Sequence, residues 1–472
     1  MMFLPRIVKK GMFGDGLLYA SMSRNMAEGR GSFWKPYFSS SYWLENIPDT
    51  YYENPPLMLW LQSLLFRMTG DHWWVEKVFC IFILIVNIVL LRFLWNIIFS
   101  TKEEYKKYWY LVVFWWYLIP VVIWGNVNNM MDSVLLSFCL AAIAFLIKSF
   151  EKKDKTDFIA LSYAGICIFC GVLTKGPVAI YPLSIPLIYF MVKGDMKFIQ
   201  LLKITLGCSF IVFFLFALLL IVETDALFFF SQYWEQRLKA VIVGSRDDMM
   251  LSGWDRLYIL EQLIIELSPT VAIISFGWIY IKIKKIHIDF NDVKIYSLIF
   301  ILAGLSATLP ILISSKQSGI YLIPGIPMFS IAAAMLTVPI MTKLESFAWL
   351  LSHSNSIKII FLTLFLGVII FSVAQFGKLG RENDLIHDIE LLKNIIPQGS
   401  KIGVCEEMKK EFVIHTYMQR MGKYELSSYP EKSDFVLQDH QCLILPLPAD
   451  MCEYNKMDLK DLKYFQVFRK KQ

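Results

Sequence analysis

The stretch VFCIFILIVNIVLLRFLWNIIF, residues Val78–Phe99, decides the fold class of this chain. A membrane hydrocarbon core about 30 Å thick needs roughly 17–25 apolar residues in one helix, and this stretch has that length. Further segments near this length follow it: Tyr108–Trp124, Asp132–Ile147, Phe158–Val172, Val178–Val192, Ile199–Val222, Leu257–Ile281, Ile295–Ser314, Ile320–Ile340 and Ile357–Phe376. The pattern predicts an all-α polytopic membrane bundle of about ten helices over residues 78–376.

The composition of the whole chain agrees with this class. Of 472 residues, 56% are hydrophobic, 15% are aromatic and 18% are charged, and the mean hydropathy is +0.51. Soluble proteins average roughly 45–50% apolar and about 25% charged residues. The net charge of +6 does not indicate nucleic-acid binding, because the Lys and Arg residues fall mostly in short clusters between apolar runs.

These basic clusters predict the orientation in the membrane, because cytoplasmic loops carry the excess of Lys and Arg. Every second loop is basic; the lysines are Lys102, Lys106, Lys107, Lys148, Lys152, Lys153, Lys155, Lys193, Lys197, Lys282, Lys284, Lys285 and Lys294. The opposite loops then face outward: residues 1–77, Gly125–Met131, Thr174–Pro177, Glu223–Arg256, Ser315–Gly319 and everything after Phe376. We therefore expect a multi-pass membrane protein with these loops on the outer side.

This orientation places residues 1–77 outside as a first loop, although no helix or signal peptide within the sequence precedes this loop to carry the chain across the membrane. Arg6, Lys9 and Lys10 would also lie on the wrong side. One interpretation is a further helix upstream of Met1, whose outer end is MMFLPRIVKKGM. The other is an N-terminal segment that lies on the membrane surface.

Residues 377–472 differ in composition and predict a small α/β domain on the periplasmic side. KIGVCEEM (401–408), KYELSSY (423–429), SDFVLQD (433–439) and KYFQVFRK (463–470) are typical of strands, and KKEFVIHTYMQRM (409–421) of a helix. Cys405, Cys442 and Cys452 either include one disulfide, which an oxidising periplasm permits, or are unpaired and buried.

The first loop contains FGDGLLYASMSRNMAEGRG, residues Phe13–Gly31, in which an aspartate stands between two glycines. We expect an amphipathic helix over Leu17–Glu28 that lies on the bilayer through Leu17, Leu18 and Met22, and a tight turn made by the glycines. Asp15 would be its N-cap, where amide hydrogen bonds and the helix dipole favour the ionised carboxylate. Such a carboxylate can accept a proton as a general base; alternatively, Asp15 only caps the helix.

The other outward loops hold polar residues, which are costly at a membrane and therefore suggest function. Glu53 lies in YYENPPLMLWLQSLLF, Asp132 in GNVNNMMDS, Lys175 in LTKGP, Arg237 in YWEQR, and Lys316 and Tyr321 in SSKQSGIYLIP. Gathered on one face, they would form an outward site for an anionic substrate. Asp132 could instead only cap its helix. A divalent metal near Glu53 has no support from a histidine cluster, so we expect no metal ligands.

The order of these motifs resembles the GT-C membrane glycosyltransferases, in particular the aminoarabinose (lipid A) transferase and protein mannosyltransferase group, from about Gly14 to Pro339. The resemblance implies a helical bundle with juxtamembrane helices in the first loop, residues 1–77. It also implies a polyprenyl (undecaprenyl) phosphate sugar donor used at the outer face of the bacterial inner membrane. It implies a hexosyl- or pentosyltransferase that acts with inversion on a lipid, polysaccharide or protein acceptor. Asp15 and Asp132 would be catalytic, and Glu53, Lys175, Arg237, Lys316 and Tyr321 would bind substrate, with Lys175, Arg237 and Lys316 as donor-phosphate contacts.

The chain departs from the family pattern at two positions. Asp15 is followed by Gly16 where the family usually has Glu, and Asn54 stands where the family often has Lys. A transporter or flippase of a lipid-linked sugar is the alternative function. Such a protein should show internal repeats and polar groups near the bilayer midplane, whereas the polar residues here cluster at one side.

Overall fold

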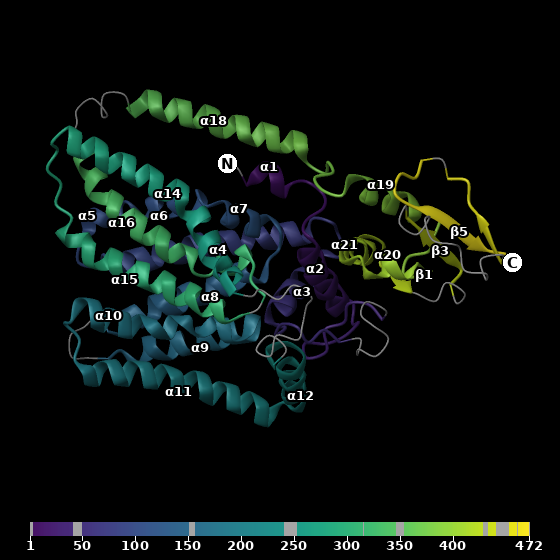
Figure 1. The fold of residues 1–472 in the computed structure, drawn as a ribbon, viewed down its shortest axis with the longest axis horizontal. Coiled ribbons are helices and arrows are strands. Elements are labelled where there is room, and N and C mark those ends of the chain that lie inside the picture. Colours follow the sequence, from purple (N-terminus) through teal and green to yellow (C-terminus); the bar gives the residue numbers. More distant parts are fainter. Residues whose placement is uncertain are drawn as a thin grey trace.

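The computed structural model describes residues 3–40, 50–150, 156–239, 253–314, 316–345, 354–427, 433–439, 453–459 and 461–471. A bundle of long helices fills one part of the elongated molecule and a small α/β domain lies at one end of it (Figure 1). The predicted fold class, a polytopic helical bundle with a small C-terminal α/β domain, is therefore confirmed.

Seven helical stretches of the described residues are long and apolar enough to cross a membrane, or up to eight if a bent pair counts as one span. The main bundle helices are α4 (Val75–Ile98), α8 (Met131–Ser149), α9 (Phe158–Lys175), α11 (Phe198–Val222), α14 (Tyr258–Ile283), α15 (Asn291–Thr308) and α16 (Ile326–Glu345), and α18 (Ser354–Gln375) runs along the outside (Figure 1). Helix α8 is central: 72% of the apolar stretch that would cross the membrane is buried inside the protein. For the span that contains α14 the buried share is 6%. The exposed apolar side chains of α14, such as Ile264 and Phe276, suit contact with lipid.

The bent pair consists of Glu103–Tyr117, which ends with α6 (Trp109–Tyr117), and α7 (Pro120–Val127), and the two axes differ by 84°. The bend coincides with Pro120 at the start of α7, preceded by the extended Ile119. Proline lacks an N–H and disfavours a helical conformation in the residue before it, so the helix restarts in a new direction.

The helical stretch Phe158–Lys193 is one of the seven that are long and apolar enough to cross a membrane, but the chain reverses direction within it. Gly176 has φ +71°, and a Cβ on Gly171 would lie 2.8 Å from the Cβ of Ala179, so the segments on either side of the glycine are packed together. The returning arm consists of η1 (Gly176–Ser184) and α10 (Ile185–Lys193), and its Tyr189 contacts Phe150 at the far end of α8. The sequence expectation of a turn near Thr174–Pro177 agrees with this; a total of about ten helices stays a prediction.

The C-terminal domain contains a five-stranded sheet in the order β2-β1-β3-β5-β4. Its strands are β1 (Lys401–Gly403), β2 (Glu425–Ser427), β3 (Phe435–Gln438), β4 (Tyr454–Lys456) and β5 (Gln466–Lys470), and its helices are α19 (Asn383–Leu392), α20 (Glu406–Lys410), α21 (Phe412–Tyr417) and the short π-helix η6 (Met418–Gly422). Strand β1 pairs in parallel with β2 and β3, and β5 pairs antiparallel with β3 and β4. Each of the four predicted strand segments contains a strand, and the predicted helix is present as α21 and η6, but the end of the first segment is helical and belongs to α20. Helices α19 and α20 and strand β4 were not anticipated.

Of the cysteines of this domain, Cys405 is disulfide-bonded, which agrees with the first of the two alternatives. Cys442 and Cys452 lie outside the described residues.

The first loop forms α1 (Leu4–Ile7), α2 (Gly14–Ala27) and α3 (Leu57–Thr69), while the loop after α11 forms α12 (Thr224–Tyr233) and the π-helix η2 (Trp234–Leu238). The remaining short elements are α5 (Glu103–Lys106), η3 (Gly253–Leu257), η4 (Leu309–Ile313) and η5 (Gly319–Leu322).

Helix α2 does not lie on the bilayer, which corrects the expectation for Leu17, Leu18 and Met22. All three are buried: Leu17 packs in the core of the C-terminal domain, and Leu18 and Met22 pack against α3, α4 and α8. The polar side of the helix is satisfied inside the protein, since Ser21 and Ser23 donate hydrogen bonds to carbonyls of their own helix. Helix α2 therefore packs between the bundle and the C-terminal domain (Figure 1).

Candidate active site

The predicted site residues come from six segments, and ion pairs, a cation–π contact and electrostatic interactions bring them together. Asp15 is in the first turn of α2, Glu53 precedes α3, Asp132 is in the first turn of α8, Lys175 ends α9, Arg237 lies in η2, Lys316 precedes η5 and Tyr321 lies in it. Their charges act on one another: Lys175, Glu53, Lys316 and Asp132 all influence the pKa of Asp15. The structure thus brings the predicted set together, while the role of each residue stays a prediction.

Asp132 and Lys175 form the tightest ion pair of this group. Lys175 Nζ lies 2.5 Å from Asp132 Oδ2, and Asp132 is only 1% exposed. The N-cap of α8 is Met130, so the alternative that Asp132 merely caps its helix is wrong. Lys175 Nζ also lies 4.9 Å from the centre of the Tyr321 ring, a cation–π contact that ties η5 to the pair.

Glu53 and Arg237 form a looser pair, with 3.7 Å between Arg237 Nη1 and Glu53 Oε2. Burial lowers the pKa of Arg237, but Glu53 and then Tyr321 outweigh this and raise it overall, which keeps the guanidinium charged. Arg237 is part of a π-helix, a local irregularity that is frequent at functional sites.

The segment that carries Arg237 is fixed to the first loop by aromatic and ionic contacts. The rings of Tyr52 and Phe229 lie 5.4 Å apart, and Lys35 Nζ lies 2.9 Å from Asp225 Oδ1. These contacts hold α12 against the residues next to Glu53, so the Glu53–Arg237 pair joins two segments that are distant in sequence.

Asp15 is the second residue of α2 and not its N-cap, which is Phe13 and makes no side-chain cap. Burial raises the pKa of Asp15 from 3.8 to about 6, against the opposing charge of Lys175. The expectation that a cap keeps this carboxylate firmly ionised is therefore wrong, as is the alternative that Asp15 only caps the helix. Its chemistry is that of a carboxylate close in pKa to neutral pH, which suits a general base better than an ordinary aspartate does.

The glycines around Asp15 allow close packing and do not make a turn. Both are helical; a Cβ on Gly14 would lie 2.6 Å from Cε1 of Phe412, and a Cβ on Gly16 would lie 2.1 Å from the carbonyl oxygen of Asn128. Any side chain at Gly16 would push α2 away from the loop before α8. The glycines therefore let two neighbouring segments approach the backbone beside Asp15.

Three further polar residues, which the sequence interpretation left without a role, hold the start of α2. Asn128 Oδ1 accepts a hydrogen bond from the Phe13 N–H at 2.8 Å, and Asn129 Nδ2 donates to the Gly16 carbonyl at 2.9 Å. Gln62 of α3 donates in turn to Asn129 at 2.9 Å. The sequence feature that could have indicated these contacts is the asparagine-rich run GNVNNMMDS, which contains Asn128 and Asn129 just ahead of Asp132.

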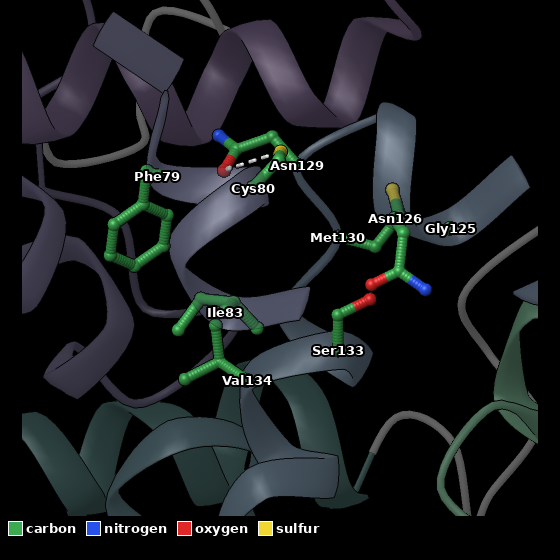
Figure 2. A pocket seen from close by; sticks show the side chains of 9 residues that line it. All are labelled: Phe79, Cys80, Ile83, Gly125, Asn126, Asn129, Met130, Ser133 and Val134. Atoms are coloured by element: carbon green, nitrogen blue, oxygen red, sulfur yellow. Dashed lines mark hydrogen bonds between the residues drawn. The ribbon is translucent and has the colours of Figure 1, made fainter. Parts of the chain in front are cut away.

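A small pocket lies behind the first turn of α8, lined by Phe79, Cys80, Ile83, Gly125, Asn126, Asn129, Met130, Ser133 and Val134 (Figure 2). The polar ends of Asn126 and Ser133 lie next to each other in it, and Asn126 Oδ1 and Ser133 Oγ are buried without a hydrogen-bond partner among the described residues. A single ordered water would satisfy both atoms. Because none of the predicted site residues lines it, this pocket belongs to the packing of α4, α7 and α8.

The part of the chain that the structure describes contains no group of three or more His, Cys, Asp or Glu side chains placed to hold a metal ion.

Comparisons with known proteins agree with this architecture. A family model described as dolichyl-phosphate-mannose-protein mannosyltransferase matches residues 53–221. The structure is similar to the crystal structure of ArnT from Cupriavidus metallidurans bound to undecaprenyl phosphate, with TM-score 0.63 and 13% identity over 99% of this chain and 95% of that one. The chain has the GT-C glycosyltransferase fold.

The structure is also similar to the Archaeoglobus fulgidus oligosaccharyltransferase in its apo form, with TM-score 0.55 and 11% identity over 91% of this chain and 66% of that one. No curated protein matches the sequence. The predicted resemblance to GT-C membrane glycosyltransferases is confirmed. The family-model match includes Glu53, Asp132 and Lys175 and ends before Arg237, and it is shorter than the Gly14–Pro339 range over which the motifs run.

Proposed function

We propose that this GT-C protein transfers a hexosyl or pentosyl group from a polyprenyl phosphate, such as undecaprenyl phosphate, to a lipid, polysaccharide or protein acceptor. The observation that carries the proposal is Asp15, a carboxylate with a pKa of about 6 that lies among the charges of Lys175 and Lys316. The similar fold of ArnT bound to undecaprenyl phosphate supports the choice of donor.

In the proposed reaction the acceptor oxygen attacks C1 of the sugar with inversion, and the bond between C1 and the phosphate oxygen breaks. Asp15 takes the acceptor proton, and the polyprenyl phosphate leaves with the bonding electron pair. A base with a pKa near neutral pH combines a high ionised fraction with useful proton affinity. Asp132 is catalytic in this scheme through Lys175, whose charge it holds at the site.

The leaving phosphate needs cationic partners, and Lys316 and Arg237 are the best placed of the three predicted ones. Lys316 is exposed, and its charge lowers the pKa of Asp15. Arg237 lies 3.7 Å from Glu53, a longer separation than a hydrogen bond, so its N–H groups can turn to a phosphate. Lys175 Nζ lies 2.5 Å from Asp132 Oδ2, so its main role in this scheme is to neutralise Asp132 and to orient Tyr321, and phosphate binding is secondary.

The distribution of charge along the bundle supports transfer over transport. Helices α2, α3 and α12, in or next to which Asp15, Glu53 and Arg237 occur in the chain, lie toward the C-terminal domain, whereas the basic segment α5 lies at the opposite end of the bundle (Figure 1). A transporter needs its polar groups near the middle of the membrane. With the basic loops in the cytoplasm, the site and the C-terminal domain face the periplasm of the bacterial inner membrane.

The proposal is tested by the release of undecaprenyl phosphate, a product common to every sugar that the donor could carry. The protein in its native membranes is supplied with a panel of undecaprenyl-phosphate sugars, and the released lipid is quantified by mass spectrometry. Asp15→Asn should lower the release by roughly 100-fold or more, as expected for loss of a general base. Asp384→Asn is the matched control, since Asp384 is an exposed first-turn aspartate of α19. Equal release by wild type and Asp15→Asn would refute the proposed role of Asp15.

A further inference from the structure

The backbone just ahead of Asp15 is held by side chains from three different elements. Lys77 of α4 donates to the Gly11 carbonyl at 2.8 Å, and Asn128 accepts from the Phe13 N–H at 2.8 Å. Between them, Met12 is held by Tyr417 of the C-terminal domain. This segment therefore takes its position from the bundle and from the C-terminal domain together.

Tyr417 holds Met12 through both of its backbone groups. Its hydroxyl accepts a hydrogen bond from the Met12 N–H at 3.2 Å and donates one to the Met12 carbonyl at 2.8 Å. Tyr417 is fully buried, so water cannot take the place of a missing hydroxyl unless the segment shifts. Both groups of Met12 would then lose this partner, and unpaired buried backbone groups are costly enough to make the segment shift.

The helix that carries Tyr417 is itself fixed to the bundle. Arg420 of η6, which continues α21, lies 2.8 Å from Asp71 and 2.8 Å from Glu76 of α4, and it is 4% exposed. Arg24 of α2 donates to the Gln419 carbonyl at 2.9 Å. Tyr417 is thus anchored by buried ionic contacts on its own helix, and Met12 is fixed relative to the bundle helices that carry the site.

We propose that the C-terminal domain is a structural part of the active site, with Tyr417 as a positioning residue that fixes the start of α2 and thereby the carboxylate of Asp15. Phe412 of the same domain completes the contact, since its ring packs directly on Gly14. This inference rests on the proposed function of Asp15.

The first test is turnover by Tyr417→Phe, which keeps the ring and removes only the hydroxyl. Misplacing a catalytic group by about 1 Å can cost on the order of 100-fold in rate, so we expect kcat to fall by about tenfold or more. The donor KM should change little, because Asp15 acts on the acceptor proton. Tyr424→Phe is the matched control: its hydroxyl donates to the Ile396 carbonyl at 2.9 Å within the same domain, and it is also buried.

The second test does not depend on activity. Dicyclohexylcarbodiimide adds to a protonated carboxyl group, and the adduct rearranges to an N-acylurea without a leaving group, so labelling of Asp15 reports its protonation. Peptide mass spectrometry of the intact protein labelled between pH 4.5 and 8 should give half-maximal labelling near pH 6 for the wild type. In Tyr417→Phe the loosened helix start admits water, so the midpoint should move to lower pH; in Tyr424→Phe it should not.

These outcomes separate this inference from the proposed function. If the wild type releases no polyprenyl phosphate, the proposed function fails, while the labelling curves still test the positioning of Asp15. If Tyr417→Phe does not fold, Phe412→Leu should produce the same downward shift by removing the ring that packs on Gly14. A folded Tyr417→Phe with wild-type kcat and an unchanged labelling midpoint would overturn the proposal.

Discussion

Asp15→Asn should stabilise this protein at neutral pH although it lowers turnover by roughly 100-fold or more. The pKa of Asp15 is raised from 3.8 to about 6, chiefly by burial, so the folded protein holds the charged carboxylate at a cost. One pKa unit corresponds to about 1.4 kcal/mol, so the whole shift corresponds to about 3 kcal/mol of the free energy of unfolding. Asparagine has nearly the same shape and carries no charge, and the variant therefore avoids this cost.

The sign of the pH dependence follows from proton binding. Between about pH 4 and pH 6 the folded state binds a proton at Asp15 that the unfolded state has lost, so the wild-type free energy of unfolding falls as the pH rises. Asparagine does not titrate. The stability of the variant relative to the wild type should therefore increase from pH 4 to pH 6 and be constant above about pH 7.

Thermal unfolding in detergent micelles at pH 4.5, 6 and 7.5 measures this difference, with Asp384→Asn as the control. Asp384 is exposed and lies in the first turn of α19, so the Asp384→Asn variant should have the melting temperature of the wild type at every pH. Turnover, measured by release of polyprenyl phosphate, should fall by roughly 100-fold or more in Asp15→Asn alone.

Two results would refute this reasoning. A difference between variant and wild type that does not change with pH would mean that the charge of Asp15 is not penalised by burial. Near-normal kcat in the asparagine variant would mean that Asp15 is not the base, and the role would pass to Asp132. An active site that gains stability when its catalytic group is removed is the expected compromise between stability and function.

Three further predictions address the ion pair, the packing of α2 and the topology. Lys175→Met should lower the free energy of unfolding by about 3–5 kcal/mol, because it leaves Asp132 buried without its charged partner. The double variant Lys175→Met with Asp132→Asn should recover most of that stability in a thermal melt, and equal losses of stability in the single and the double variant would argue against the pair. Gly16→Ala should disrupt folding or activity, since its Cβ would lie 2.1 Å from a backbone carbonyl, whereas Gly277→Ala in α14 meets nothing within 4 Å and should behave as wild type in expression and turnover assays. A cysteine placed at the exposed Lys401 should react with an impermeant thiol reagent on intact spheroplasts, and labelling only after permeabilisation would reverse the orientation.

Much of the site could be predicted because its residues follow from local rules. Charged residues at the ends of apolar segments are rare and costly, so Asp132, Lys175, Arg237 and Glu53 stood out against their surroundings. Because successive membrane spans alternate in direction, the loops that hold these residues were all predicted to lie on the outer side of the membrane. The structure brings their charges into contact, through the Asp132–Lys175 and Glu53–Arg237 pairs, while their roles stay predictions.

The interpretation of α2 failed because it used the sequence of that helix alone. Leu17, Leu18 and Met22 are spaced as they would be in a surface helix, and nothing local shows that the C-terminal domain, hundreds of residues later in the chain, covers them. The glycines beside Asp15 suggested a turn for the same reason. Their true constraint is the proximity of Phe412 and of the Asn128 carbonyl.

The sequence by itself determined the membrane class, the order of the spans, the strands of the C-terminal domain and the identity of the charged residues, because hydropathy and strand patterning depend on neighbours along the chain. Only the tertiary structure decided that Asp132 pairs with Lys175, that Tyr417 holds Met12, and that the pKa of Asp15 lies near 6. Burial and hydrogen bonding between residues remote in sequence exist only once the chain has packed, and the protonation of a carboxylate depends on that packing and not on the residues beside it.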